Sequence, residues 1–408
     1  MKRLLLLARG DGGLHFDLSG ESILKNFPMP LVVLAEKTNA RQFQGLGDNV
    51  VVEIVRYYDI PGIHACVQRL ANEPGLLGIA ALSEEVIELA AELREKLNLP
   101  GMRPAEAQRF RNKLLMKEAL STAGIRVPEN IECIDRKGVE RLLAKHHRLV
   151  IKPVDGFGSK EVEFVQSATE LDAWYGKGKK LDEFEAEEYI DGTLYHLNAL
   201  VRDGEILLTA CAPYLPGMGN IDFSSGTPLV SAMLTSGELR DRFEAFSTQA
   251  IQVLGLRDGV THMECFLKND GEIVFCEVGA RPGGGGIVLM IEAQYGINFP
   301  RASLLLQGGL GDQVTLDPGH PGKVVGLMGF RYPHSCFIER IAPVEAFNED
   351  WIHHVRIHKQ AGDFVAGAAH CTDYIGLLIF SAADFAEFET QRLNLYQRFY
   401  SSLETKAV

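Results

Sequence analysis

Two glutamates, Glu264 and Glu277, are the residues of this chain whose type and spacing most clearly suggest chemistry. They lie in two Val/Ile/Phe-rich runs joined by Asn269-Asp270-Gly271, and Asp-Gly is a strong signal for a two-residue hairpin turn. That turn places Glu264 opposite Glu277 and Phe266 opposite Phe275, with roughly 5 Å between opposed Cβ atoms. Two carboxylates so close repel each other unless a cation lies between them. Mg²⁺ binds through one or two carboxylates together with substrate phosphates, so we predict a site for Mg²⁺, or for Mn²⁺ in its place.

The rest of the hairpin decides which way this pair faces. Side chains alternate along a strand, so His262 and Arg281 share the face of the two glutamates. Cys265 and Cys276 then point the other way, and we interpret them as small core residues rather than nucleophiles. A solvent-facing acidic pair is the alternative, but apolar neighbours such as Met263 leave little polar face to expose. A register slip of one residue would put the glutamates on opposite faces.

The composition is that of a globular protein without a nucleic-acid partner. Its 408 residues, 46% hydrophobic and 23% charged, predict two to three domains of roughly 150 residues each. The net charge of −13 lacks the basic footprint of nucleic-acid-binding proteins. The seven cysteines form no CxxC pair, which favours free thiols in a reducing compartment. The apolar start ends at Arg9, too early for a signal peptide, and no run is long enough to span a membrane, so we predict a cytoplasmic protein without a membrane partner.

Strands alternate with helical patterns in residues 1–98, which predicts an open parallel α/β domain. Ser83 is placed to cap a helix, and Glu84 suits the positive end of that helix. Asn98-Leu99-Pro100-Gly101 interrupts the pattern and marks a boundary. The strands of this domain are expected at 4–8, 31–35, 50–55 and 78–82.

A second domain is expected over residues 99–310, beginning with one helix from Pro104 to Gly124 that carries Arg111 and Lys113. From residue 311 short strand-like pieces dominate, and a helix closes the chain. Residues 311–408 are therefore predicted to form a mostly β domain.

Lys152 and the glycines after it are candidates for phosphate binding. A lysine at the end of the apolar run LVIKP must be paired or reach solvent, because burying an isolated ammonium is costly. Gly156 and Gly158 would let backbone N–H groups close over phosphate oxygens. The alternatives are a solvent-exposed strand-end lysine and an ordinary β-turn. No Walker A pattern is present, so a P-loop fold is not expected.

The order of these segments resembles the ATP-grasp superfamily of ligases, in the branch of biotin carboxylase, the carbamoyl-phosphate synthetase large chain and the L-amino-acid ligases. The resemblance covers nearly the whole chain and predicts the ATP-grasp fold, with a mobile lid at about residues 125–190. It rests on five motifs in order, which read SEEVIELAAELREKLNLPG, RNKLLMKEALSTAGIRVP, LVIKPVDGFGSKEV, EAEEYIDGTLYHLNAL and HMECFLKNDGEIVFCEVGARPGGG.

The resemblance implies a role for each candidate residue. Lys113 and Lys152 would contact the phosphates of ATP, with Ser159 at the end of the glycine loop. Glu264 and Glu277 would hold Mg²⁺, and Arg281 would lie near an acyl phosphate, so Arg281, Lys152 and Glu277 are the predicted catalytic residues. The adenine pocket would be lined by Glu187, Glu188 and Ile190. His196 is a further candidate for the nucleotide site, with a hydrogen-bonded strand histidine as the alternative.

Three positions depart from the pattern of the superfamily. Many relatives carry Glu-x-Asn-x-Arg on the last strand, whereas here Gly279 replaces the asparagine, which removes one metal ligand. Leu194 stands where relatives often carry a glutamate, and Glu161 replaces the usual glycine after Ser-Lys. By this resemblance, Gly279 would affect the binding of a second metal ion, Leu194 would affect a ribose contact, and Glu161 would affect the closing of the lid.

We therefore predict an ATP- and Mg²⁺-dependent carboxylate–amine ligase that forms an amide through an acyl phosphate. The run from Gly279 to Gly286 resembles the amino-acid ligases more than biotin carboxylase, and this resemblance implies an amino acid or a related small carboxylic acid as substrate. Glycines there would permit close approach of the substrate. A biotin- or bicarbonate-dependent carboxylase and a catalytically inactive nucleotide-binding protein are the alternatives. The expected partners are small carboxylate and amine substrates, and the resemblance implies a homodimer. Residues 218–226 are a Gly/Ser-containing segment that either covers a substrate or forms a plain surface loop.

Overall fold

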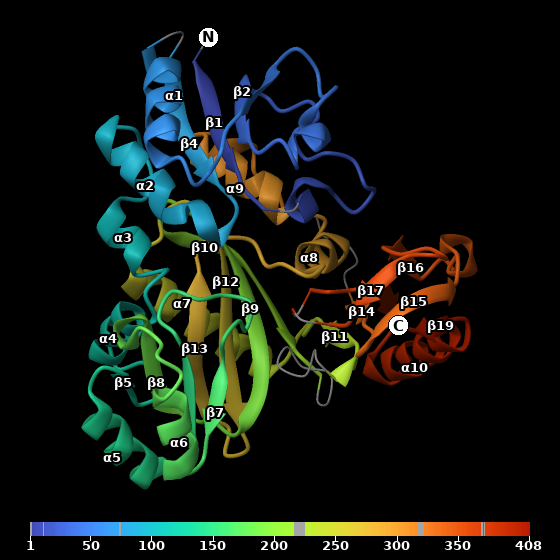
Figure 1. Cartoon of the computed structure of the whole chain (residues 1–408). Coiled ribbons are helices and arrows are strands. Elements are labelled where there is room, and N and C mark those ends of the chain that lie inside the picture. Colours follow the sequence, from blue (N-terminus) through green and yellow to red (C-terminus); the bar gives the residue numbers. More distant parts are fainter. Residues whose placement is uncertain are drawn as a thin grey trace.

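The computed structural model describes residues 2–10, 12–72, 75–215, 225–316, 322–368, 370 and 372–408. An N-terminal sheet with its helices lies above a central antiparallel sheet in the view of Figure 1, and a mostly β C-terminal module lies beside both.

The N-terminal sheet is parallel, as predicted. Its order is β3-β2-β1-β4, and successive residues of its strands face two different cores. Leu5 and Leu7 face the two helices α1 (Ile60–Asn72) and α2 (Ile87–Lys96), whereas Leu4 and Leu6 face α9 (Phe299–Gln307). The sequence did not predict α1. The strands are β1 (Arg3–Ala8), β2 (Leu31–Ala35), β3 (Val50–Ile54) and β4 (Leu76–Ala81).

The central sheet carries the predicted glutamate hairpin. It is antiparallel in the order β10-β9-β12-β13, and the long helix α7 (Glu238–Leu254) covers one face together with α4 (Lys113–Thr122). On the other face lies α9, and α8 (Ile287–Tyr295) packs against α9 and the C-terminal module. The strands are β9 (Gly192–Arg202), β10 (Glu205–Pro213), β12 (Gly259–Lys268) and β13 (Ile273–Gly279).

A small subdomain precedes the central sheet in the chain. Its four strands have the order β5-β8-β6-β7, and α5 (Arg136–His146) and α6 (Ala168–Tyr175) complete its separate core around Trp174. The predicted lid contains this subdomain. The strands are β5 (Asn130–Glu132), β6 (Leu149–Pro153), β7 (Glu163–Val165) and β8 (Phe184–Glu188).

The C-terminal module is mostly β and ends with the long helix α10 (Phe385–Ser401), followed by a short last strand. One sheet has the order β11-β14-β18-β16 and consists of β11 (Leu229–Ala232), β14 (Val324–Phe330), β16 (Ile352–Ile357) and β18 (Gly376–Ala382). A smaller sheet consists of β15 (Ser335–Arg340), β17 (Phe364–Ala366) and β19 (Glu404–Ala407). Because β11 lies far before residue 311 in the sequence, this sheet crosses the expected boundary.

The expected single helix from Pro104 to Gly124 is two helices. A short helix, α3 (Pro104–Gln108), ends before residues 109–112, and α4 begins at Lys113. The side chain of Asn112 caps α4 by accepting hydrogen bonds from the backbone N–H groups of Leu114 and Leu115. Arg111 therefore lies in the break, where its side chain reaches Glu84. Lys113 stands at the first turn of α4, where its side chain reaches Glu277 of the central sheet. Among the described residues, no helix is long and apolar enough to cross a bilayer.

Candidate active site

The predicted pairing of Glu264 with Glu277 is present, although the hairpin around it differs from the expectation. The loop has three residues, since the N–H of Gly271 donates to the carbonyl of Lys268 and Gly271 has φ +87°. Phe266 is therefore paired with Val274, and the predicted pairing with Phe275 was wrong. A one-residue bulge at Cys276 restores the register, so Glu264 and Glu277 still face each other.

This bulge also changes where Cys276 points. Cys265 is fully buried in the core beneath the central sheet, as predicted. Cys276 instead lines a cavity beside Glu277, so its predicted place in the core was wrong. Burial raises the pKa of the Cys276 thiol, which keeps the thiol protonated and poorly nucleophilic.

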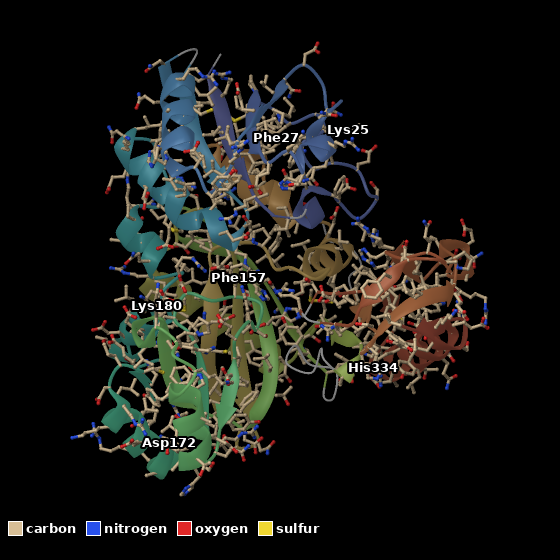
Figure 2. All side chains as sticks on the ribbon, in the orientation of Figure 1. Lys25, Phe27, Phe157, Asp172, Lys180 and His334 are labelled. Atoms are coloured by element: carbon tan, nitrogen blue, oxygen red, sulfur yellow. The ribbon has the colours of Figure 1, made fainter. Side chains whose placement is uncertain are left out.

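Two cavities meet at the glutamate pair. The larger has a volume of about 590 Å³ and lies between the lid subdomain and the central sheet. The smaller, of about 440 Å³, extends from the pair toward the N-terminal part and the C-terminal module. Figure 2 labels Phe157 near the middle of the molecule. Phe157 belongs to the glycine loop at residues 154–160. The linings of both cavities share Phe157, Ser159, Tyr214, Glu264 and Glu277.

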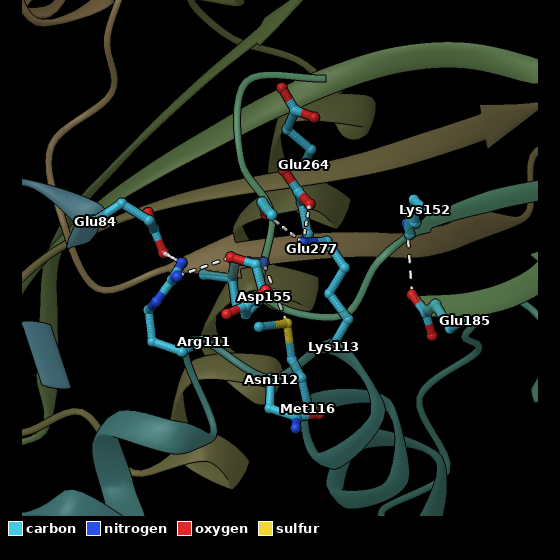
Figure 3. A network of polar contacts seen from close by, with 12 residues as sticks. Glu84, Arg111, Asn112, Lys113, Met116, Lys152, Asp155, Glu185, Glu264 and Glu277 are labelled. Atoms are coloured by element: carbon cyan, nitrogen blue, oxygen red, sulfur yellow. Dashed lines mark hydrogen bonds and ion pairs between the residues drawn. The ribbon is translucent and has the colours of Figure 1, made fainter. Parts of the chain in front are cut away.

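Glu264 and Glu277 are held by different partners. The hydroxyl of Tyr214 donates to Glu264 at 2.9 Å, and the carboxylate of Glu264 is almost fully buried. Lys113 Nζ lies 3.3 Å from Glu277 Oε2 and also donates to the carbonyl of Gly156 (Figure 3). Burial opposes the ionisation of Glu277, but the ammonium groups of Lys113 and Lys152 outweigh burial and lower its pKa to about 2. Glu277 is therefore anionic near neutral pH.

The oxygen atoms of this pair fit Mg²⁺. Hard divalent cations prefer carboxylate oxygen, and Mg²⁺ leaves several positions for phosphates and water. Among the described residues, no group of three or more His, Cys, Asp and Glu side chains could hold a metal ion by itself. The two carboxylates of this pair would leave the remaining positions of such a cation to phosphate oxygens and water.

Two buried lysines, Lys113 and Lys152, line one end of the larger cavity, and a third buried lysine pairs with the same glutamates as Lys152. Lys152 Nζ lies 2.6 Å from Glu187 Oε1. Burial alone would lower the pKa of Lys152, but the neighbouring carboxylates outweigh burial and raise it well above its usual value. Lys117, which the sequence analysis missed, pairs with Glu185 at 2.6 Å and with Glu187. Its spacing of four residues from Lys113 on a helix was the available signal, because that spacing places both on one face.

The other end of the larger cavity is mostly apolar and aromatic. Ile190 and Leu194 line it, so the glutamate that relatives often carry at position 194 is replaced by an apolar wall. The guanidinium of Arg148 stacks over the ring of Tyr189 at 3.7 Å. Glu188 also lines this end and accepts two hydrogen bonds from Arg126, at 2.7 and 2.8 Å.

The glycine loop lies where both cavities open. Gly156 lines the larger cavity, Gly158 lines the smaller one, and Ser159 lines both. Ser159 and Glu161 have φ values of +60° and +57°, a backbone region that glycine adopts more readily. The usual glycine at position 161 would therefore remove strain that the glutamate carries here.

His196 is not brought to the cavities. Its imidazole is fully buried and lies behind the described residues that line them. Because Ser231 Oγ donates to the carbonyl of Pro213, His196 Nε2 must donate to Ser231, at 2.8 Å. Its Nδ1 then accepts from Asn198, whose oxygen receives Nδ1–H of His262 at 2.8 Å. This geometry fits a hydrogen-bonded strand histidine, which was the alternative to a contact with the nucleotide.

Arg281 lines the smaller cavity, on the far side of the glutamate pair from Lys152. Its Nε donates to Glu84 Oε2 at 2.7 Å, and Glu84 Oε1 accepts from Arg111 at 2.7 Å. Glu84 begins the short helix η3 (Glu84–Val86), and Ser83 makes no side-chain cap there. The predicted role of Glu84 as a charge at a helix end therefore misses its buried contacts with two arginines.

The smaller cavity has both apolar and polar walls. Leu14 and Phe16 reach it from the N-terminal part, and Leu377 reaches it from the C-terminal module. Arg356 lies on β16 and forms no ion pair with any described residue. Most of the segment 218–226, which was expected to cover a substrate or form a loop, lies outside the described residues.

Comparison with known proteins supports the ATP-grasp resemblance. Residues 146–289 match the family of the ATP-grasp domain. An L-arginine-specific L-amino acid ligase of Bacillus subtilis is 27% identical over 309 residues, which are 70% of this chain and 70% of that protein. The crystal structure of an L-amino acid ligase from Bacillus licheniformis superposes with a TM-score of 0.75 at 21% identity, covering 100% of this chain and 99% of that one.

A second solved structure carries a nucleotide. The biotin carboxylase domain of a 2-oxoglutarate carboxylase from Hydrogenobacter thermophilus, in complex with MgADP and bicarbonate, superposes with a TM-score of 0.73 at 15% identity. The match covers 99% of this chain and 90% of that one. At such identities the superpositions establish the ATP-grasp fold alone.

Proposed function

Because this chain belongs to the ATP-grasp superfamily of ligases, we propose that it joins a carboxylate to an amine at the expense of ATP, with Mg²⁺ as its metal ion. The product is an amide, and the carboxylate component is an amino acid or a related small carboxylic acid. The observation that carries this proposal is the meeting of two cavities at Glu264 and Glu277. One cavity has the lysines and flat apolar walls that suit a nucleotide, and the other has the arginines that suit a carboxylate.

The two cavities divide the reaction between them. Lys113 and Lys152 would hold the phosphates of ATP, and Glu264 and Glu277 would hold Mg²⁺ beside them, because all four line the larger cavity. When bound, Mg²⁺ would neutralise phosphate charge and keep the terminal phosphate in line with its acceptor. The substrate carboxylate attacks that phosphate, which breaks its bond to ADP and yields an acyl phosphate. The amine then attacks the acyl carbon, the new C–N bond forms, and inorganic phosphate leaves.

Arg281 is the residue that we propose to contact the acyl phosphate. Nε and Nη1 of its guanidinium donate to Glu84 and to the carbonyl of Pro282. This anchoring fixes the plane of the group, while its position in the lining of the smaller cavity makes it available to an anionic ligand. A guanidinium that is already oriented before the reaction stabilises the charge that develops on the transferred phosphoryl group.

The far part of the smaller cavity favours a polar substrate with a carboxylate. Three buried polar atoms in its lining have no hydrogen-bond partner among the described residues, namely Gln42 Nε2, Ser83 Oγ and His354 Nε2. His354 Nδ1 donates to the carbonyl of Leu18, and burial lowers the pKa of the ring, so Nε2 of the neutral ring accepts. Arg356 supplies a cation to this lining, and Gln42, Ser83 and His354 are polar residues of the same lining, which suits the carboxylate and amine of an amino acid.

The test is ADP release over pairs of amino acids, with detection of the condensed product by mass spectrometry. The proposal expects stoichiometric ADP and amide for at least one pair. Release of ADP that requires bicarbonate and yields no amide would instead identify a carboxylase. Tight ATP binding without ADP release across the panel would identify an inactive nucleotide-binding protein. A homodimer, which the resemblance implies, is tested separately by light scattering.

A further inference from the structure

The smaller cavity contains a carboxylate where the superfamily pattern would place an asparagine. A Cβ atom added to Gly279 would lie 2.7 Å from Glu84 Oε2, closer than nonbonded carbon and oxygen approach each other. An asparagine at position 279 would therefore force the end of the Glu84 side chain to shift from its place between the two arginines. Glycine at position 279 and glutamate at position 84 form a matched pair, although 195 positions separate them in the sequence.

Glu84 is a buried junction between two arginines. Its side chain is only 8% exposed, and each of its oxygens accepts from a different guanidinium at 2.7 Å. Burial opposes ionisation of Glu84, but Arg281 and Arg111 outweigh it and keep its pKa below the usual value. Because Nε of Arg281 binds Glu84, the carboxylate determines where the rest of that guanidinium points.

The same junction continues to the glycine loop (Figure 3). Arg111 Nη2 donates to the carbonyl of Asp155 at 2.7 Å, and the backbone N–H of Lys113 donates to the carbonyl of Val154 at 2.9 Å. An unbroken path of charge-assisted hydrogen bonds thus runs from Arg281 through Glu84 and Arg111 to the loop that precedes Gly156. It joins the N-terminal part, the lid and the predicted catalytic arginine.

We propose that Glu84 is a positioning residue, which sets the orientation of Arg281 and links it to the position of the glycine loop at residues 154–160. In this chain a carboxylate from the N-terminal part occupies the space of the strand asparagine. That carboxylate binds Arg281 and Arg111 instead of a metal ion. The orientation of Arg281 matters for catalysis only if the proposed ligase function holds, whereas the link to the loop is independent of substrate.

The first experiment compares Glu84→Gln with Glu88→Gln. Glu88 lies 3.9 Å from Arg111 and is half exposed, so its variant removes a charge near Arg111 without touching Arg281. In the ADP-release assay, Glu84→Gln should lower kcat at least tenfold and change the KM for ATP less than threefold, and Glu88→Gln should change neither by more than twofold. Equal effects of the two variants, or a change in KM alone, would overturn the positioning role.

A second measurement requires no carboxylate or amine substrate. Hydrogen exchange of residues 154–160 is followed with and without a non-hydrolysable MgATP analogue. We expect the analogue to protect the loop in the wild type and clearly less in Glu84→Gln. Unchanged protection would refute the link to the loop even if the ligase assay shows no product in the wild type, so failure of this inference and failure of the proposed function are distinguishable.

A third comparison changes position 279 and begins with a variant that keeps every charge. Gly279→Ala adds only the methyl group that meets Glu84 Oε2. It should lower kcat severalfold in the wild type and much less in the Glu84→Ala background, where the space is free. Thermal melting checks that each variant is folded. The same fold-loss in both backgrounds, or no loss in either, would contradict the matched pair.

Discussion

The two cavities that meet at Glu264 and Glu277 are built in different ways. The larger one is lined by a continuous part of the chain, residues 113–277, with its lysines and glutamates on neighbouring strands and one helix. The smaller one draws its lining from residues between 13 and 377, which come from all three parts of the fold. Alternation along a strand can predict the first kind of site, since neighbours in space are near neighbours in a motif. The second kind depends on how distant segments pack, so the chemistry of this protein is easier to predict than its substrate.

The largest expected effect on activity comes from changing the glutamate pair that both cavities share. Glu277→Gln removes a charge from the proposed metal site and should lower the rate of ADP release by about 10²–10³-fold, the size typical for loss of one preorganised charge in a catalytic site. Glu272→Gln on the same hairpin is the control, because Glu272 is exposed and pairs with Lys268. Steady-state kinetics and Mn²⁺ binding followed by electron paramagnetic resonance measure the two consequences. Full activity of Glu277→Gln would remove the basis of the metal site.

The largest effect on the free energy of unfolding is expected from the buried ion pairs beside the larger cavity. Lys117→Met leaves the buried carboxylates of Glu185 and Glu187 with one cation fewer, and breaking a buried ion pair from one side costs about 3–5 kcal/mol. Lys137→Met, on α5 of the lid, changes the same residue types in a site without a buried partner among the described residues. Denaturant unfolding of the two variants provides the comparison. A difference below 1 kcal/mol would mean that the buried pairs contribute little to the lid.

A smaller effect, on the binding of the amino acid substrate alone, is expected in the smaller cavity. Arg356→Ala removes the cation of β16 and should raise the KM for one amino acid component about tenfold, the loss of about 1.4 kcal/mol of binding, while the KM for ATP stays the same. Arg340→Ala on β15 is the matched control, because Arg340 pairs with Glu404 at the surface. If Arg356→Ala instead changed the KM for ATP, the division of labour between the cavities would be wrong.

The smallest effect concerns the glycine loop between the cavities. Glu161→Gly replaces a residue at φ +57° with one that tolerates this conformation, and relief of left-handed strain is about 1 kcal/mol. The greater freedom of glycine in the unfolded chain and the loss of the pair with Lys179 reduce this gain. We expect a net stabilisation below 1 kcal/mol in thermal unfolding. A clear destabilisation would show that the pair with Lys179 outweighs the backbone strain.

The sequence predicted the parallel N-terminal sheet, the central hairpin and the closing helix because each shows its period in consecutive residues. The pairing of Glu264 with Glu277 was predicted correctly only because the bulge at Cys276 offsets the extra residue in the turn. Nothing in the local pattern reveals that compensation, so the direction of Cys276 was missed. The helix break before Lys113 was also missed, since the apolar spacing continues across it.

Contacts between distant segments were beyond the reach of the sequence pattern. Glu84 resembles an ordinary acidic residue in a first helical turn until Arg111 and Arg281 are brought to it. His196 carries no local sign that Ser231 and Asn198 will occupy both of its ring nitrogens. The residues of the smaller cavity that face the substrate belong to this class, which explains why the sequence leaves the substrate open.

The strand β11 has a consequence for any attempt to divide this protein. Its four residues, Leu229–Ala232, are fully buried and hydrogen-bond along β14, although they precede that strand by about ninety positions. A gene cut near residue 311 would leave the C-terminal fragment with a bare sheet edge, and the other fragment with an unpaired apolar strand, a combination that promotes aggregation. Exchange of the C-terminal module between homologous enzymes should therefore carry residues 229–232 along as part of the graft.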